Sequence, residues 1–362
     1  MNRRSLLTRG IGTLAGLSGS GLLWHSLAQD GNPARDMINA NTQRTIDASL
    51  DWLSRQQNAN GSFGTGAYNG NVAVTSVAGL AFMSAGHQPG RGLYGDNITR
   101  CLENMLTCED RGTPGFLNAR GGGFGAHGPM YGHGFATLFL AEAHGMIHNA
   151  NLRRDIRDLL GRAIRLIVSA QNGEGGWRYQ PRPTDADLSV TVCQIMALRA
   201  ARNAGINVPR STAEKCTEYV KACQDPNSGG FRYQRFGGGP GFARTAAGVV
   251  ALYSAGIYDD PSVERGLNYL MTFRPGPNRN IGFLGDVNAH YFYGHYYAVQ
   301  AMWIAGGNYW RQWYPAIRDE LLTNRRNDGS WLQGIVPCTH YCTAMALIIL
   351  QVPNNYLPIL QR

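Results

Sequence analysis

The chain has 362 residues, of which only 16% are charged and 47 are glycine. It is long enough for one large domain or two ordinary ones, and this composition suits helices that are covered on both faces and joined by tight turns. The formal net charge is +9, but the positive residues are scattered arginines without a basic, aromatic-rich stripe, which argues against nucleic-acid binding.

Residues 1–28 have the pattern of an export signal. Arg3 and Arg4 begin a twin-arginine motif, a mildly apolar, glycine-rich run follows over 11–23, and Ser26-Leu27-Ala28 places small residues where a signal peptidase cleaves. The apolar run is short and weak for a transmembrane helix, although an uncleaved anchor or an unstructured tail is the alternative. We therefore expect an exported, periplasmic protein and leave peripheral membrane contact open.

After a linker over 29–41, residues 42–362 are expected to form a single domain of six repeated units. Each unit reads as a helix, a glycine-rich loop with an aromatic residue, and a second helix that ends at Gly or near it. The aromatic residues recur roughly every 50–60 residues, and the second unit carries an extra loop over 112–116. They are Phe63, Phe124, Trp177, Phe231, Phe283 and Trp331. The second helices are expected at 72–85, 131–144, 185–204, 244–255, 293–305 and 341–351.

This repetition predicts an all-α fold, an (α/α)6 toroid. A single amphipathic hairpin cannot bury its own apolar stripe, but neighbouring hairpins stacked side by side can. With six units the stack can close on itself, with first helices outside, second helices inside, and a central cavity. Residues 353–362 have no partner in the repeat and are expected to cover one end.

A glutamine at the end of the first helix recurs with the aromatic residue. Gln57 and Gln171 each precede a Gly-x-aromatic loop. A glutamine there can bond to unpaired carbonyls at the helix end or to the next helix, and the aromatic residue can pack across to the next unit. One such pair would fit an ordinary surface loop, whereas a repeated pair favours a structural role.

Trp52-Leu53-x3-Gln57 before Gly61-x-Phe63, and Gln171 before Gly175-x-Trp177, resemble the QW-type repeat of squalene and oxidosqualene cyclases and protein prenyltransferase β subunits. The resemblance covers residues 45–351. It implies the toroid of that superfamily and no particular activity. Triterpene cyclases have two such barrels, whereas this chain has length for one.

Asp185-Ala186-Asp187-Leu188 resembles the Asp-x-Asp-Asp acid motif of class II terpenoid cyclases, which lies at the start of an inner helix. By this resemblance Asp187 is the proton donor and Asp185 its partner, since a proton shared between close carboxylates raises a pKa. Leu188 stands where the motif has its last Asp, so the match is incomplete. The alternative is that Asp187 only caps its helix.

Further candidate ligand-binding residues are those at the starts of inner helices, which in a toroid surround one electropositive mouth of the cavity. They are Tyr131, His133, Arg244, Tyr293, His295, His340 and Tyr341. For the histidines, simple capping or packing is an equally good interpretation.

Seven cysteines, an odd number, argue against a disulfide framework. Cys101 and Cys108, like Cys216 and Cys223, would be roughly 10 Å apart on one helix, too far to bridge, so buried thiols are expected. Cys338, His340 and Cys342 superficially resemble the neighbourhood of the prenyltransferase zinc site, but no Asp-x-Cys partner precedes them. The three side chains could still bind zinc with a fourth ligand from elsewhere, but we expect no metal and no cofactor.

The favoured function is binding or processing of an apolar, isoprenoid-type ligand, by acid-initiated cyclisation if the chain is an enzyme. Inner-helix aromatics would line the cavity and stabilise a carbocation: Phe135, Phe139, Tyr296, Tyr297 and Trp303. One alternative is a non-catalytic binding or scaffold toroid. Another is a sugar-active α/α barrel, which needs two carboxylates, with Asp187 as one and Asp286 or Glu142 as the other.

Overall fold

The computed structural model describes residues 37–118, 128–276 and 284–361. Within these residues the chain is helical and forms no strand, only isolated bridges. Six helices make an outer ring: α1 (Ala40–Ser54), α3 (Gly95–Thr107), α5 (Ala150–Ser169), α7 (Arg210–Ala222), α9 (Pro261–Met271) and α12 (Gly307–Asn324). Six make an inner ring: α2 (Val72–Ser84), α4 (Pro129–His144), α6 (Leu188–Asn203), α8 (Phe242–Ser254), α11 (Tyr291–Ala305) and α13 (Thr339–Gln351). A short helix, α10 (Leu284–Ala289), precedes α11.

The sequence of each helix explains which ring it joins. Outer helices are amphipathic: α5 buries Leu160 and Ile167 on one face and exposes Asp155 and Arg165 on the other. A helix with one apolar stripe stabilises the fold by turning that stripe inward. Inner helices are apolar nearly all round, and every residue of α13 from Cys342 to Gln351 is buried. Such a helix must be covered on all sides.

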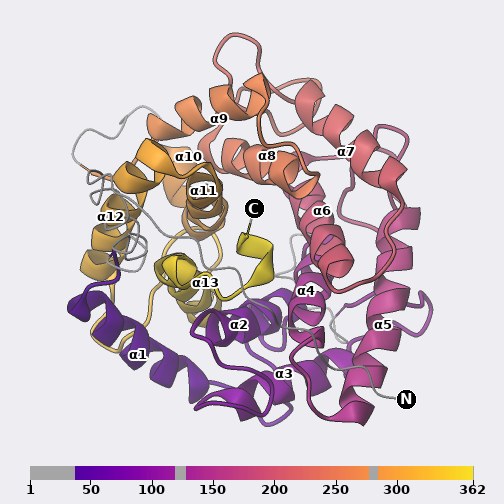
Figure 1. Cartoon of the computed structure of the whole chain (residues 1–362), viewed down its shortest axis with the longest axis vertical. Helices are drawn as coiled ribbons and strands as arrows, with labels where there is room; N and C mark the ends of the chain where they lie inside the picture. Colours follow the sequence, from indigo (N-terminus) through magenta and orange to yellow (C-terminus); the bar gives the residue numbers. More distant parts are fainter. Residues whose placement is uncertain (1–36, 119–127, 277–283, 362) are drawn as a thin grey trace, which may run out of the picture.

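The ring is closed (Figure 1). The last inner helix, α13, packs against α2 and α1 of the first unit. Ser49 Oγ donates to the carbonyl of Gly329 at 2.7 Å, and Gln351 Nε2 donates to the carbonyl of Ala81 at 3.1 Å. These contacts confirm the predicted (α/α)6 toroid, with second helices inside.

The recurring glutamine ties three of the units to the next. Gln171 Nε2 donates to the carbonyl of Gly175 in its own loop, at 2.8 Å, and to that of Thr212 in the first turn of α7, at 2.9 Å. Gln57 and Gln224 make the same pair of bonds in the first and fourth units. The predicted structural role of the glutamine is therefore confirmed in these three units.

The second unit differs from the prediction. Phe124 and Phe283 lie outside the described residues, but the place of an anchor in unit two is held by Leu117. Gly115 has the positive φ (+84°) seen at Gly175 (+94°) and approaches the backbone of the next outer helix at Arg162, as Gly175 approaches Lys215. The segment 112–116, expected as an extra loop, thus contains the glycine of the repeat. The search for recurring aromatic residues did not reveal this glycine, because the anchor of unit two is aliphatic.

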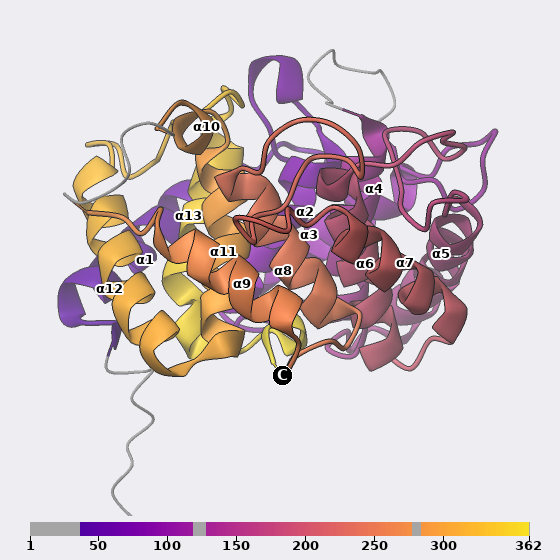
Figure 2. The ribbon, with the colours of Figure 1, turned by 90° about the horizontal axis from the view of Figure 1, so that it is seen from above.

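The C-terminal tail covers the end of the inner ring where its helices finish, as expected, and Figure 2 shows the C-terminus beneath that end. It forms two short turns, Val352–Asn354 and Pro358–Leu360, with Val352, Ile359 and Leu360 buried. Asn354 Nδ2 donates to the carbonyl of Ser84, and Arg199 donates to the carbonyls of Tyr253 and Gln361.

The expected export signal, residues 1–28, lies outside the described residues. Helix α1 begins at Ala40, inside the segment 29–41 expected as a linker, because the Asn39 side chain caps it by accepting the Thr42 N–H at 2.9 Å. Across the described ranges, no helix combines the length and the apolar composition needed to span a membrane.

Candidate functional site

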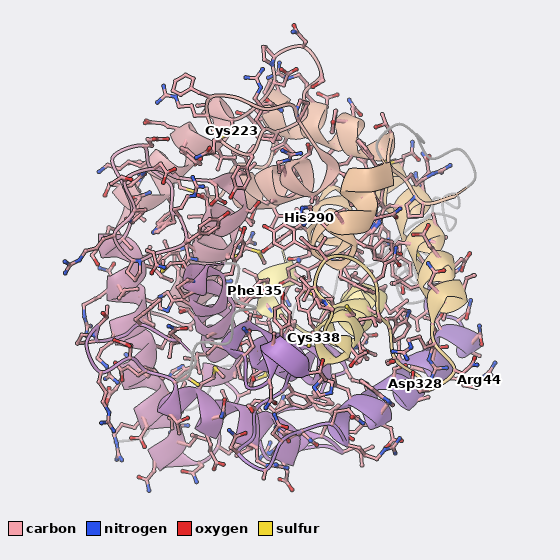
Figure 3. All side chains as sticks on the ribbon, turned by 180° about the vertical axis from the view of Figure 1, so that it is seen from behind. Arg44, Phe135, Cys223, His290, Asp328 and Cys338 are labelled. Carbon is pink, nitrogen blue, oxygen red and sulfur yellow. The ribbon has the colours of Figure 1, made fainter. Side chains whose placement is uncertain are left out.

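A cavity of about 520 Å³ lies at the end of the inner ring where its helices begin. All six inner helices contribute to it from their first two turns, and the loops before them complete the wall. Figure 3 shows the ring from behind, with Phe135 and His290, two residues of this wall, near its centre. The apolar part of the wall includes Val72, Val74, Leu117, Phe135, Ile335 and Val336.

Tyrosines provide half of the polar side chains in this wall. They come from loops and from inner helices alike: Tyr68, Tyr131, Tyr179, Tyr233, Tyr293 and Tyr341. Burial raises the pKa of Tyr131, Tyr293 and Tyr341 well above the ordinary value. These phenols therefore stay neutral at physiological pH and can donate hydrogen bonds.

Four of the seven ligand-binding candidates line the cavity together: Tyr131, Arg244, Tyr293 and Tyr341. They come from α4, α8, α11 and α13. Tyr131 and Tyr293 meet edge to face, with ring centroids 6.4 Å apart, and Tyr293 donates from its hydroxyl to the carbonyl of Ser189 at 2.8 Å. The structure thus brings these four side chains into one site.

The three histidines do not line the cavity; each is buried in the protein instead. His133 Nδ1 accepts the Leu117 N–H at 3.2 Å, and burial lowers the pKa of His133 to about 3. His340 Nδ1 accepts the Gly64 N–H at 3.0 Å and joins the last unit to the first. His295 packs among Tyr291, Phe242 and Trp313. These surroundings fit the packing interpretation.

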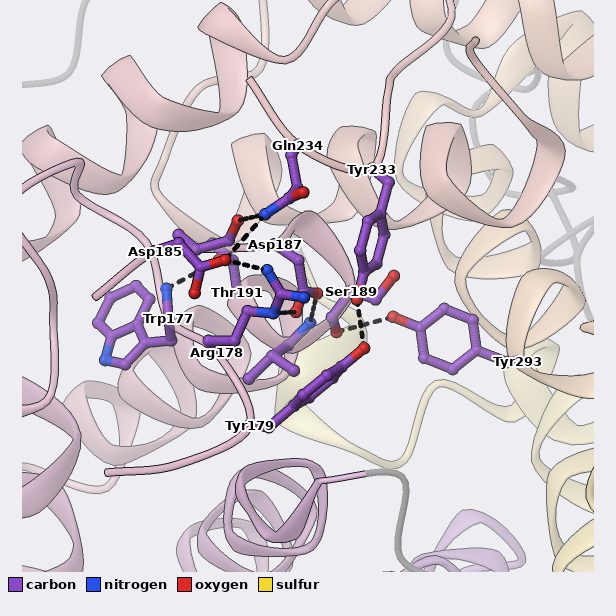
Figure 4. A network of polar contacts seen from close by, with 12 residues as sticks. Trp177, Arg178, Tyr179, Asp185, Asp187, Ser189, Thr191, Tyr233, Gln234 and Tyr293 are labelled. Atoms are coloured by element: carbon purple, nitrogen blue, oxygen red, sulfur yellow. Dashed lines mark hydrogen bonds and ion pairs between the residues drawn. The ribbon is translucent and has the colours of Figure 1, made fainter. Parts of the chain in front are cut away.

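Asp187 caps α6. Its Oδ1 accepts the Val190 N–H at 2.8 Å, its side chain is fully buried, and Oδ2 lies 3.4 Å from Arg178 Nε (Figure 4). Asp185 is half exposed and accepts hydrogen bonds from Arg178 and Gln234. Arg178 therefore lies between the two carboxylates, which do not share a proton.

Burial raises the pKa of Asp187 to about 6, while the Val190 N–H and Arg178 act in the opposite direction. The acid form is thus more available than for an ordinary Asp. However, Asp187 does not line the cavity. Tyr179 and Tyr233, whose hydroxyls are hydrogen-bonded to each other, line the wall on this side, with the Arg178 guanidinium 4.9 and 5.7 Å from their ring centroids (Figure 4).

The resemblance to a zinc site does not extend to the geometry. His340 Nδ1 is occupied by the Gly64 N–H, and Cys342 Sγ donates to the carbonyls of Gln333 and Val336. In the part of the chain that the structure describes, no three His, Cys, Asp or Glu side chains converge as metal ligands. All seven cysteines are buried thiols, which confirms that prediction.

The other sequence candidates lie away from the wall. Glu142 is near the end of α4 opposite the cavity, where its Oε2 accepts the Ile359 N–H of the tail at 3.1 Å. The side chain of Asp286 lies outside what the structure describes. Of the five aromatics expected to line the cavity, only Phe135 does so. Phe139, Tyr296 and Tyr297 are buried deeper in the ring, and Trp303 packs against Trp310 on α12.

Three wall tyrosines, Tyr68, Tyr179 and Tyr233, were missed by sequence reasoning because they lie on loops rather than on inner helices. A usable signal was present for two of them. Trp177-Arg178-Tyr179 and Phe231-Arg232-Tyr233 repeat the same anchor-Arg-Tyr order in successive units. The second residue after the buried anchor therefore points to the wall in both loops.

Comparison with known proteins identifies the family. The prenyltransferase α/α toroid domain matches residues 33–204, 133–273 and 207–350. No curated protein sequence matches the chain significantly. Among solved structures, the type II terpene cyclase MstE from Scytonema is similar, with 15% identity, a TM-score of 0.59, and coverage of 88% of this chain and 99% of the cyclase.

Two further similar structures show how much this likeness implies about function. A variant of the same cyclase in complex with geranylgeranyl dihydroxybenzoate has 14% identity, a TM-score of 0.58, and coverage of 89% and 100%. The α-1,6-mannanase GH76A of Salegentibacter sp. HEL1_6 has 9% identity, a TM-score of 0.59, and coverage of 86% and 98%. Both activities occur on this fold, so the likeness shows the architecture alone. Because this family domain matches nearly the whole described length of the chain, the chain belongs to the prenyltransferase α/α toroid family.

Proposed function

We propose that this toroid binds an elongated apolar ligand of the isoprenoid type in the cavity at the start of its inner helices. The observation that carries the proposal is the cavity itself: about 520 Å³, walled by all six inner helices. This volume is typical of small-molecule sites, which are mainly apolar with a few placed polar groups. Val72, Val74, Leu117, Phe135 and Val336 supply the apolar surface.

The N-terminal pattern adds a location to this proposal. Residues 1–28, with Arg3-Arg4, would direct the folded protein out of the cytoplasm. The ligand would then be a molecule met in or near a membrane rather than a cytoplasmic diphosphate. Peripheral contact with that membrane is part of the same proposal.

Binding is better supported than cyclisation. An acid that starts cyclisation must reach its substrate, and Asp187 lies behind Tyr179 and Tyr233 instead of in the wall. The raised pKa of Asp187 has a sufficient cause in its burial. A cyclase activity, if present, would need the proton of Asp187 to pass this tyrosine pair.

The sugar-active alternative has less support. Glycoside hydrolysis requires two carboxylates that flank the substrate, and no Asp or Glu belongs to the described part of the wall. Glu142 is held by the tail at the opposite end of the ring. The likeness to the mannanase therefore extends to the fold, whereas the described wall lacks the two carboxylates that glycoside hydrolysis requires.

The proposal can be tested by filling the cavity with an added side chain. A Cβ added at Gly132 in α4 would meet nothing closer than 3.6 Å, and Gly132 lines the wall, so Gly132→Leu places a side chain in the cavity while improving helix propensity. Gly161→Leu on the outer helix α5, where the nearest atom is 3.7 Å away, is the matched control. Binding of geranylgeraniol would be measured by native mass spectrometry and tryptophan fluorescence.

We expect Gly132→Leu to weaken binding at least tenfold and Gly161→Leu to leave it unchanged. Equal binding by all three proteins, or binding by none, would overturn the proposed site. The catalytic question is answered separately by Asp187→Asn, which keeps an oxygen for the helix cap. Products formed from lipid extracts at the wild-type rate by this variant would remove Asp187 from any mechanism.

A further inference from the structure

We infer that the protein binds to an anionic lipid membrane with the mouth of its cavity facing the lipid. Three mouth loops form the contact surface: the segments 178–187, 232–241 and 332–338, which lead into α6, α8 and α13. The inference rests on the proposed function, to which it adds the contact surface, its orientation and the charge of the lipid. Exposed apolar side chains, their continuity with the cavity and two exposed arginines support it.

Exposed apolar side chains are concentrated at the mouth end of the ring. Phe236 is 81% exposed, and Leu332 and Ile335 are each 48% exposed, all three on mouth loops. The other two large apolar side chains that the described residues expose are Leu93, between α2 and α3, and Tyr356, in the tail. Both lie at the opposite end, where Figure 2 shows the C-terminus. The two ends of the ring therefore differ in apolar character.

Ile335 joins the exposed surface to the cavity. It lines the cavity while about half exposed, and its backbone N–H donates to the carbonyl of Ala289 in α10 at 2.9 Å, which fixes its loop at the rim. Tyr233, on the same loop as Phe236, also lines the cavity. An apolar ligand that left a bilayer here would pass from lipid to an apolar wall without exposing its surface to water, which would be unfavourable.

Two arginines give this surface a positive charge. Arg182 and Arg235 are exposed on neighbouring mouth loops, and neither forms an ion pair with an acidic side chain that the structure describes. By contrast, Arg178 and Arg232 on the same loops are paired with aspartates. The Arg235 guanidinium lies 5.2 Å from the ring centroid of Phe236. An aromatic ring beside a guanidinium suits the boundary of a bilayer, where the ring meets acyl chains and the cation meets phosphates.

A lipid surface fits this face better than a second protein does. Phe236 is followed by Gly237, Gly238 and Gly239, and a Cβ added at any of these glycines would meet nothing within 4 Å. The loop tip is therefore surrounded by open space. Stable protein interfaces bury about 800 Å² on each partner and need a complementary shape, whereas a bilayer admits a protruding aromatic side chain without one. Isolated exposed apolar residues are common, but here they surround the opening of an apolar cavity.

The experiment measures flotation of the ligand-free protein with two kinds of vesicle: pure phosphatidylcholine, and an equimolar mixture of phosphatidylcholine and phosphatidylglycerol. We expect at least tenfold stronger binding to the mixed vesicles, lost at high salt. Phe236→Ser should weaken this binding at least fivefold. Leu93→Ser is the matched control, because Leu93 is 80% exposed at the opposite end of the ring, and should change nothing. All variants keep the whole chain, so any contribution of residues 1–28 is common to them.

The arginines and the orientation are tested separately. Each arginine near an anionic surface contributes about fivefold to binding, so the double variant Arg182→Gln, Arg235→Gln should bind mixed vesicles at least tenfold more weakly. Mixed vesicles should shift the fluorescence of Phe236→Trp to the blue, relative to the wild type, and leave that of Leu93→Trp unchanged. Thermal unfolding like that of the wild type would show that these variants are folded.

Equal binding to both kinds of vesicle, or equal loss in Phe236→Ser and Leu93→Ser, would overturn the inference. So would a dimer in solution that Phe236→Ser dissociates, since this face would then bind a second copy of the chain. Gly132→Leu, which fills the cavity, should still bind vesicles. Vesicle binding by a protein that binds no geranylgeraniol would contradict the proposed function alone, and the reverse result would contradict this inference alone.

Discussion

The backbone N–H of Leu117 donates a hydrogen bond to His133 Nδ1, and the corresponding bond in four other units runs to a threonine. The acceptors there are Thr75, Thr191, Thr245 and Thr343, for the N–H groups of Phe63, Trp177, Phe231 and Trp331, at 2.9 to 3.1 Å. In unit two, His133 thus accepts the hydrogen bond that a threonine accepts in the four other units. This gives it a structural role that needs no ligand.

Removing that acceptor should destabilise the fold without affecting the cavity. His133→Ala leaves the buried Leu117 N–H unsatisfied, which costs about 1–3 kcal/mol, and adds a void. His133→Asn retains an acceptor and should cost less. Urea unfolding would give the difference, and geranylgeraniol binding by the folded variants should equal that of the wild type. A fully stable His133→Ala protein would show that the bond contributes little.

Substitution of Gly115 should destabilise the fold. Its neighbour Gly112 is not constrained in the same way. The φ of Gly115, +84°, disfavours any other residue, and an added Cβ would lie 2.4 Å from the Arg162 carbonyl oxygen. Gly115→Ala should lower the free energy of unfolding by about 2 kcal/mol or more. Gly173→Ala, where an added Cβ meets nothing within 4 Å, should change it little. Equal effects of the two substitutions would contradict the assignment of Gly115 to the repeat.

The sequence contained most of the architecture because the toroid is built from a repeated local pattern. Gln57, Gln171 and their Gly-x-aromatic loops are sequence-local, and their bonds reach only the next unit. The repeat loop of unit two was not predicted because Leu117 stands where the other units have an aromatic residue. The C-terminal ends of the inner helices were predicted within a few residues for the same reason, since Gly follows or ends several of them.

The site was less accessible to sequence reasoning. A helix start predicts a position near the mouth but not which way a side chain points. Tyr131 and Tyr293 face the cavity, whereas His133 and His295, two residues further along the same helices, turn away from it. Asp187 combined an acid motif with a capping position, and only three-dimensional placement separates these roles.

Glu142 should contribute a fall in the free energy of unfolding as the pH rises from 6.5 to 8.5. Burial raises the pKa of Glu142 to about 7, above its ordinary value of 4.5. The folded state therefore binds the proton more tightly than the unfolded state, and this stabilisation is lost as the pH rises through 7. The expected loss is about 1 kcal/mol.

Glu142→Gln should flatten this dependence, since the amide can still accept the Ile359 N–H and carries no charge. The buried His133, with its lowered pKa, acts in the opposite direction up to and through pH 6.5, as do His87, His144 and His340, in the wild type and in the variant alike. The difference between the two proteins therefore isolates the effect of Glu142. Chemical unfolding at three pH values would measure the slope. The same slope in the wild type and in Glu142→Gln would show that another group causes it.

Arg178 should stabilise the fold most at high pH. It is the charge that opposes the burial of ionised Asp187, which it approaches at 3.4 Å. In Arg178→Gln the pKa of Asp187 should rise further above 6, so the buried carboxylate destabilises the folded state at pH 8 and is relieved by protonation near pH 5. The deficit relative to the wild type should therefore shrink as the pH falls.

Arg182 provides the control for this prediction, because its side chain is exposed in the same loop. Arg182→Gln should show no deficit at either pH. If Arg178→Gln were equally destabilised at pH 5 and pH 8, loss of its packing on Tyr179 and Tyr233 rather than loss of charge would be the cause.

No residue of the tail from Val352 to Gln361 lines the cavity, and the ring beneath the cavity is filled by Phe139, Tyr296 and Tyr297, all of them buried. The floor of the cavity is therefore made by side chains of the inner helices. Replacing Phe139 by a smaller residue, rather than shortening the tail, would deepen the cavity and lengthen the chain that it can hold.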